Sequence, residues 1–160
     1  KSLEESLIVD SIEIGSSYNW QIVKENEILF KNAKYLSFAN EEYSYTGGAH
    51  GNTVSKHYVF DLEHNNLLSA EDLLDISKCG EIILLQKKSL EKAGQDIDGF
   101  WEDGFRCNAN FYILDKGFVF HYDQYEIASY AAGPMDIFVS FEEIKPYLAN
   151  PEILNEFLNK

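Results

Sequence analysis

A histidine inside a glycine-rich stretch is the residue of this chain best suited to chemistry. The stretch reads Tyr45-Thr46-Gly47-Gly48-Ala49-His50-Gly51-Asn52, and strand-like segments enter and leave it. Histidine titrates near neutral pH, so His50 is a candidate general base or metal ligand. The more frequent role of such a ring is a hydrogen bond to the backbone of a tight turn, and we favour that interpretation.

The other histidines and the glycines complete no known motif. His57 follows closely, but rings on opposite sides of a strand junction need not converge, and we expect His64 and His121 to lie elsewhere. The sequence has neither CxxC nor HExxH, so it predicts no metal site. No Lys-Ser/Thr follows the glycines as in a P-loop, and the strand pattern after them excludes a dinucleotide fingerprint. We therefore expect no cofactor.

An acidic loop with aromatic residues, 96–105, is the second candidate site. It fails as an EF-hand, because Gly94 and Phe105 would take the first and twelfth positions, where oxygen ligands are needed. Carboxylates around aromatic anchors are typical of a protein contact patch. The residues concerned are Asp98, Trp101, Glu102 and Asp103. An equally good alternative is that the aromatic side chains fold back as a satellite core.

The sequence shows no catalytic constellation, and we assign no catalytic residue. Acidic residues are so abundant that any two could converge as in a glycosidase, which makes that signal uninformative. There is no GxSxG elbow, and Cys107 has no identifiable activating partner. Cys79 and Cys107 could pair in an oxidising compartment, but their spacing does not establish a disulfide, and two buried free thiols are an equally simple interpretation.

The first half of the chain is predicted to form β-strands. Short strands are predicted at 18–23 and 28–30, joined by a polar turn at 24–27. A longer strand is predicted at 34–46, with a bulge or an exposed edge at 40–42. After the glycine corner, alternation places Val54, Tyr58 and Phe60 on one face of a strand, and Ser55 and His57 on the other.

The second half mixes helices with a hairpin. Ser69 begins a short helix through a capping-box pattern, and Ser77 is expected to cap a longer helix that ends at Gly94. A hairpin follows at 111–122, with Gly117 expected in a left-handed conformation. A strand at 137–139 precedes a second capping box at Ser140 and a last helix through residue 158. The fold class is α+β, with mainly antiparallel sheet, two hairpins, a packed central helix and short C-terminal helices.

The composition predicts one folded unit. The chain has 160 residues, of which 45% are hydrophobic and 14% aromatic, enough for a sizeable core. We expect a single domain over 1–160, with two packed lobes of about 1–62 and 63–160 as an alternative. No segment has the roughly 20 apolar residues that cross a bilayer. The chain opens at Lys1 and its single methionine is Met135, as expected of a trimmed or mature fragment.

The charge is strongly negative over the whole chain. Asp and Glu number 27 against 13 Lys and Arg, for a net charge of −14. The excess divides evenly, with 13 acids and 6 bases through Gly80 and 14 acids and 7 bases after it. Such a field repels nucleic acid and anionic membranes and attracts cationic partners. Plain solubility is the simpler explanation of the same charge.

Three segments in a fixed order carry a resemblance to a known family. They are the glycine corner at 45–52, the run 58–74 with Tyr58-Val59-Phe60-Asp61-Leu62, and the run 110–133 with Tyr125-Glu126-Ile127. Together they resemble the bacterial extracytoplasmic domain family shared by the RsiV anti-sigma factor and the PdaC peptidoglycan deacetylase. The resemblance covers roughly residues 36–147.

The resemblance implies a non-catalytic, envelope-facing module for binding or sensing. In the deacetylase the reaction belongs to a separate domain, and in the anti-sigma factor the domain binds lysozyme. A basic lysozyme-like protein is thus the expected partner, with the 96–105 loop and the corner Gly47, Gly48, His50 and Gly51 at the rim of the contact. An alternative is a peptidoglycan or sugar fragment stacked on Tyr125, Tyr130 and Trp101. The least favoured alternative is an orphan hydrolase with His50 as base.

Overall fold

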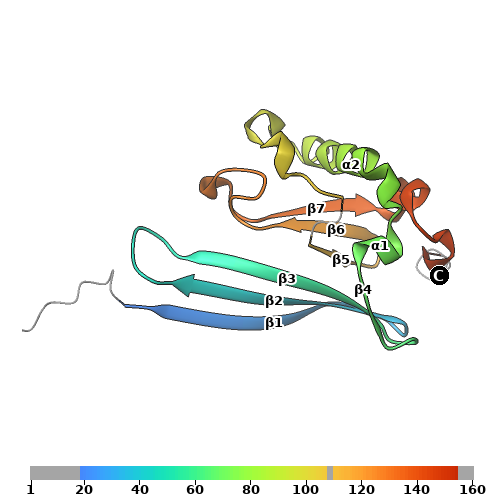
Figure 1. Cartoon of the computed structure of the whole chain (residues 1–160), viewed down its shortest axis with the longest axis horizontal. Helices are drawn as coiled ribbons and strands as arrows, with labels where there is room; N and C mark the ends of the chain where they lie inside the picture. Colours follow the sequence, from blue (N-terminus) through green and yellow to red (C-terminus); the bar gives the residue numbers. More distant parts are fainter. Residues whose placement is uncertain (1–18, 108–109, 155–160) are drawn as a thin grey trace, which may run out of the picture.

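The computed structural model describes residues 19–107 and 110–154 and shows an α+β fold built on two antiparallel sheets (Figure 1). The strand order is β1-β2-β3-β4 in the first sheet and β5-β6-β7 in the second. The strands are β1 Gln21–Lys31, β2 Tyr35–Tyr45, β3 Asn52–Asp61, β4 Asn66–Leu68, β5 Phe111–Ile113, β6 Gly117–Tyr122 and β7 Met135–Ser140. The helices are α1 Ala70–Leu73, α2 Cys79–Lys92 and α3 Phe141–Ile144.

Helix α2 packs on β7 and lies on the side of the second sheet that faces away from the first sheet (Figure 1). The order of layers is therefore first sheet, second sheet, helix. The two sheets meet along β3 and β5. Short 3₁₀ turns connect these elements, at Ile76–Lys78, Ile97–Gly99, Glu102–Gly104, Tyr130–Ala132, Lys145–Tyr147 and Pro151–Leu154.

Strand β1 is one continuous strand, which corrects the prediction of two short strands and a turn at 24–27. It pairs with β2 on both sides of that segment, so its polar residues are strand residues. The register shifts between Ile28 and Phe30, which places the irregularity on β1 and not at 40–42 of β2. Strand β2 lies between β1 and β3, so it is not an edge either.

The alternation predicted for β3 is confirmed, and the second sheet decides which face is covered. Ser55 and Val59 are buried, whereas Val54 on the opposite face is exposed. Strand β6, in contrast, is buried on both faces. Its residues Phe118, Phe120 and Tyr122 pack toward α2 and α3, as shown by the hydrogen bond from the Tyr122 hydroxyl to Gln86 of α2, at 2.6 Å.

Gly117 was predicted to take a left-handed backbone conformation, and this is wrong. The positive-φ glycines of the described chain are Gly47, Gly48, Gly94 and Gly133. Gly117 begins β6 opposite Ser140, where an added Cβ would lie 2.3 Å from the carbonyl oxygen of Val139. The glycine is needed because another backbone passes close by, and not for its conformational freedom.

The helix ends follow the predicted caps with one exception. Capping boxes are present at Ser69 with Asp72 and at Ser140 with Glu143. Ser77, however, does not cap α2. Asp75 is instead the N-cap residue of the 3₁₀ turn Ile76–Lys78, and its side chain accepts a hydrogen bond from the Ser77 N–H. This turn leads directly into α2. Of the predicted last helix, 151–154 forms a 3₁₀ turn, and 155–158 lies outside the described residues.

A disulfide between Cys79 and Cys107 ties the start of α2 to the end of the acidic loop, across 28 residues. The loop itself contains two 3₁₀ turns. The satellite-core alternative applies to part of it, because Phe105 is buried and Phe100 packs against the core, whereas Trp101 is 43% exposed.

Candidate functional site

The glycine corner is a structural junction. Gly47 and Gly48 both have positive φ, and the Tyr45 hydroxyl donates to the Gly48 carbonyl oxygen at 2.9 Å. His50 Nδ1 lies 3.1 Å from the carbonyl oxygen of Gly51, a contact to turn backbone of the kind favoured above. Its ring stacks on Tyr130 at 3.7 Å between centroids.

The other candidate residues divide into two groups. Tyr130 donates to the Gly51 carbonyl oxygen at 3.1 Å, and Tyr125 lies beside Tyr130 with the ring centroids 5.6 Å apart. The corner thus gathers Gly51, His50, Tyr125 and Tyr130. Asp98, Glu102 and Asp103 lie on the acidic loop beside α2, where Glu102 pairs with Lys87. Trp101 joins this loop to 125–130 through its backbone N–H, which donates to the Ile127 carbonyl oxygen at 2.7 Å.

The densest polar cluster lies between the two sheets, and the sequence did not predict it. His57 of β3 and His121 of β6 approach to 4.6 Å between ring centroids, which corrects the expectation that they lie apart. His121 Nδ1 is 2.7 Å from Asp136 Oδ1 of β7, and its Nε2 is 3.2 Å from Asp123 Oδ1. Tyr112 of β5 stacks on His57 and donates to Asp136 at 3.2 Å.

The two histidines have opposite protonation states near neutral pH. Burial of the His121 ring lowers its pKa, but hydrogen bonds to Asp123 and Asp136 outweigh burial and raise the pKa to about 9. Burial of His57 lowers its pKa to about 4, and the neighbouring charge of His121 acts in the same direction. His121 is therefore an imidazolium with both N–H groups engaged, and His57 is a neutral imidazole.

Asn110 fixes the tautomer of His57. The Asn110 side-chain amide donates to the Ser55 carbonyl oxygen, so its Oδ1 is the acceptor for the His57 backbone N–H at 2.8 Å and for Nδ1 at 3.3 Å. Nε2 is thus left with a lone pair. Every buried side-chain nitrogen or oxygen in the described part of the chain has a hydrogen-bond partner. His57 Nε2 has no partner there, so this atom is not buried and is open to solvent.

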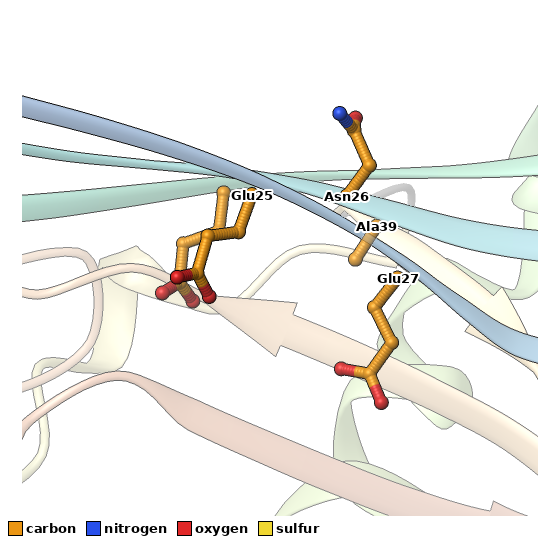
Figure 2. Close-up of a pocket in the computed structure, with 5 residues that line it drawn as sticks. Glu25, Asn26, Glu27 and Ala39 are labelled. Atoms are coloured by element: carbon orange, nitrogen blue, oxygen red, sulfur yellow. The ribbon is translucent and has the colours of Figure 1, made fainter.

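Acidic side chains of the first sheet face this cluster. The register sets Glu25 directly opposite Glu41, and Glu41 opposite Ser55, while Glu27, Ala39 and His57 form the next row. Figure 2 shows Glu25 and Glu27 pointing to the same side of β1 and Asn26 to the other. Glu41 accepts a hydrogen bond from the Ser55 hydroxyl at 3.2 Å.

Together these residues line an open groove between the sheets, which we call the inter-sheet groove. One part, of about 220 Å³, is lined by Glu27, Leu29, Ala39, Glu41, Ser55, His57, Tyr112, His121, Pro134 and Asp136. The adjoining part, of about 300 Å³, shares Glu27, Ala39 and Glu41 and adds Glu25 and Asn26. Among the residues that the structure describes, no lysine or arginine lines either part, so four carboxylates face the buried His121 imidazolium there.

Comparison with known families places the chain. A model for a family of proteins of unknown function, DUF3298, matches residues 61–142, just over half of the sequence. The chain belongs to the DUF3298 family. A second model, described as Deacetylase PdaC, matches residues 9–53. These matches confirm the resemblance seen in the sequence. Among curated proteins no match was found.

Two solved structures of the DUF3298 family share the fold. One, from Bacteroides fragilis, superposes with a TM-score of 0.77 at 24% identity over 92% of this chain and 61% of the other. The second, from Pseudomonas aeruginosa, has a TM-score of 0.68 at 18% identity over 82% of this chain and 63% of the other. The chain thus spans less than two thirds of the length of these DUF3298 structures.

The inter-sheet groove lies where the two matched segments meet. The PdaC segment supplies Glu25, Glu27 and Glu41, and the DUF3298 segment supplies Tyr112, His121 and Asp136. Ser55 and His57 fall between the two matches. The groove is therefore built from both parts of this DUF3298 chain, and neither part alone would form it.

The groove offers hydrogen-bond acceptors and negative charge, and both of these suit the binding of a cation. Carboxylates and a neutral imidazole Nε2 all accept hydrogen bonds. Over residues 19–107 and 110–154, no group of three or more His, Cys, Asp or Glu side chains is arranged to hold a metal ion. The same residues include no helix long and apolar enough to cross a membrane. The sequence pattern did not predict the groove because Glu25 and Glu27 were assigned to a turn. A continuous strand at these positions would have predicted both side chains on one face of the sheet.

Proposed function

We propose that this DUF3298 domain is a non-catalytic binding module, which takes a cationic side chain of a basic protein partner into the inter-sheet groove. The observation that carries the proposal is the row Glu25–Glu41, in which two carboxylates stand directly opposite each other without an ion-pair partner in the described chain. Like charges in this position destabilise a sheet. A partner's cation would relieve that repulsion.

The size and chemistry of the groove support a single side chain as the bound group. Each part lies at or below the lower end of the volumes typical of small-molecule pockets, about 300–1,000 Å³. An arginine or lysine side chain supplies several N–H donors. Its strongest hydrogen bonds in the groove would be the charge-assisted ones to Glu27, Glu41 and Asp136. His57 Nε2 would accept one more.

The net charge of −14 supports a basic protein as the partner, because long-range attraction steers such partners together. A lysozyme-like protein of the cell envelope is our candidate, on the strength of the family resemblance. An extracytoplasmic location fits the disulfide, since disulfides persist in oxidising compartments. The match to the PdaC model agrees with the same setting.

The test is calorimetric titration with a basic lysozyme at low and physiological ionic strength. We expect binding that weakens with salt and falls at least about 10-fold in the double variant Glu25→Gln/Glu41→Gln, as expected for the loss of charge-assisted hydrogen bonds. The matched control is Glu81→Gln/Glu91→Gln, which removes the same charge from the exposed face of α2. Equal effects of the two pairs, or no binding at either salt concentration, would contradict the proposal.

A second candidate, a glycan-fragment module, is favoured by one observation. Tyr125 is 53% exposed beside the stacked rings of Tyr130 and His50, which gives an aromatic surface suited to a sugar ring. Titration with soluble peptidoglycan fragments would separate the two candidates. Fragment binding that is insensitive to salt and lost in Tyr125→Ala would favour the glycan module.

A further inference from the structure

Strand β1 is a long edge strand. Its eleven residues pair with β2 on one side, and within residues 19–107 and 110–154 no strand pairs with its other side. Figure 1 shows β1 at the margin of the first sheet. The opposite edge of the same sheet is β4, which has only three residues. An edge strand as long as β1 offers a row of backbone groups on which another extended chain can pair.

The backbone groups that point out from this edge belong to Lys24 and Asn26. The Ser55 N–H of β3 points away from β2, since it donates to the Asp123 side chain at 2.9 Å. In an antiparallel sheet, hydrogen-bonded and non-hydrogen-bonded pairs alternate along and across the strands. Along the row that joins Ser55 to Glu25 through β2, this alternation turns the N–H and C=O groups of Glu25 toward β2. Those of Lys24 and Asn26 therefore point outward.

The side chains next to these outward groups point to the inter-sheet groove. Glu25 and Glu27 lie on one side of β1 and Asn26 on the other (Figure 2), and residues 21–28 are all exposed. Directly opposed residues of an antiparallel pair share a face of the sheet. A residue that an added strand places opposite Glu25 or Glu27 would therefore lie beside that glutamate and at the mouth of the groove.

The same glutamates select the kind of strand that can be added. Two copies of β1, paired antiparallel about Glu25 or Asn26, would set Glu25 opposite Glu25 or Glu27, and opposed like charges destabilise a sheet. Inward-pointing charges of this kind protect an edge against pairing with a second copy. A lysine or arginine opposite Glu25 would instead form an opposite-charge pair, and it would relieve the repulsion between Glu25 and Glu41 in the same row.

We propose that the basic partner binds by strand addition, in which an extended segment pairs antiparallel with β1 and places basic side chains opposite Glu25 and Glu27. This inference rests on the proposed function, because it names the form in which the partner presents its cations to the inter-sheet groove. Backbone hydrogen bonds to Lys24 and Asn26 supply affinity, and the alternate basic side chains supply specificity. The recognised segment is therefore an exposed strand or loop with lysine or arginine at every second position.

The first test uses the unaltered chain and a peptide of about nine residues, in which threonine and lysine alternate. At saturating peptide and low ionic strength, we expect hydrogen exchange of the Lys24 and Asn26 amides to slow at least about 10-fold. Two N-methylated forms of the peptide keep its charge. Methyl groups on the threonines, whose N–H groups face β1 in this arrangement, should weaken binding at least about 10-fold, and methyl groups on the lysines less than about twofold.

The variant Asn26→Pro tests the same edge from the side of the domain. It removes an N–H that points out of the sheet and none that pairs with β2, a position at which an edge strand accepts proline. The matched control is Asn26→Ala, which keeps the N–H but also loses the hydrogen bond that the Asn40 side chain donates to Asn26 at 2.9 Å. We expect Asn26→Pro to bind the unmethylated peptide and a basic lysozyme at least about fivefold more weakly than Asn26→Ala.

Three results would overturn this inference: no binding of the peptide, equal effects of the two methylation patterns, or a larger effect of methyl groups on the lysines. These results use the unaltered chain, so they hold even where Asn26→Pro perturbs the fold. Sedimentation of the free chain as a dimer that Asn26→Pro dissociates would assign the edge to a second copy. The proposed function fails on a different measurement, the titration of lysozyme with Glu25→Gln/Glu41→Gln.

Discussion

Two neighbouring histidines of similar burial take opposite protonation states when their hydrogen-bond partners differ, as His57 and His121 show. Both rings are largely buried between the same two sheets. Two carboxylates hold both nitrogens of His121, whereas His57 has the neutral amide of Asn110. The charged ring then opposes protonation of the neutral one. The pair keeps one acceptor, His57 Nε2, available in an acidic groove.

This difference predicts a stability maximum near pH 6.5. His121 has a folded pKa of about 9 against roughly 6.5 unfolded, so its contribution is complete below pH 6.5 and is lost as the pH rises to 9. His57 has a folded pKa of about 4, so stability also falls as the pH drops from roughly 6.5 toward 4, where only the unfolded chain takes up the proton.

Urea unfolding across pH 4–10 measures both limbs. His121→Gln should flatten the alkaline limb, whose size is on the order of 2 kcal/mol. His64→Gln is the control, because His64 also has a raised pKa, through Asp61, but is exposed. If His64→Gln flattened the alkaline limb as much as His121→Gln, the buried pair would not be its origin.

The opposed carboxylates give a second prediction at the residue scale. Glu25→Gln should stabilise the fold by about 0.2–1 kcal/mol, because it removes like-charge repulsion across the β1–β2 ladder. Glu42→Gln on the opposite face is the control, since it breaks the Lys24–Glu42 ion pair and should leave stability unchanged or lower it by up to about 1 kcal/mol. A loss of stability in Glu25→Gln, measured by urea unfolding, would mean that the Glu25 carboxylate stabilises the native sheet.

At the scale of elements, the sequence predicted what depends on local pattern and missed what depends on pairing. The Ser69 and Ser140 caps, the stop at Gly94 and the alternation of β3 are local, and all are confirmed. Strand β1 was divided because its middle is polar, yet pairing with β2 keeps it extended. The inter-sheet groove needs the register of three strands and the packing of two sheets, which no single segment encodes.

Gly117 shows the same limit and gives a test at the element scale. A side chain there would meet the backbone of β7 rather than strain its own φ, so Gly117→Ala should destabilise by about 1–3 kcal/mol through overpacking. Gly80→Ala in α2 is the matched control, because nothing lies within 4 Å of its added Cβ. It should be neutral or stabilising by up to about 1 kcal/mol.

Thermal or urea unfolding of the two variants checks this comparison. The expected order of stability is Gly80→Ala, then the unaltered chain, then Gly117→Ala. A Gly117→Ala variant as stable as the unaltered chain would show that β6 and β7 can separate at that point without cost.

The whole molecule combines a diffuse charge with a local site. The acids exceed the bases equally in both halves, so the long-range field does not mark any one surface. The inter-sheet groove does, because it gathers four carboxylates from both matched segments. The electrostatic field and the groove affect different stages of binding. The field changes the rate of association, and contacts in the groove change the rate at which the complex dissociates.

This division of roles predicts separable rates of association and dissociation with a basic lysozyme. Neutralising Glu81 and Glu91 on α2 should lower the association rate constant slightly and leave dissociation unchanged. Neutralising Glu25 and Glu41 should mainly speed dissociation, at least about 10-fold, because charge-assisted hydrogen bonds in the bound state are lost. Association of every variant should slow as the Debye length falls from about 30 Å at 0.01 M salt to about 8 Å at physiological salt.

Surface plasmon resonance at the two salt concentrations resolves both rate constants. The decisive comparison is the dissociation rate of the two double variants at physiological salt, where the diffuse field is screened most. A difference confined to the groove variant would locate the bound cation between the sheets. Identical dissociation rates would mean that a basic partner senses only the overall charge, and the inter-sheet groove would then need a different ligand.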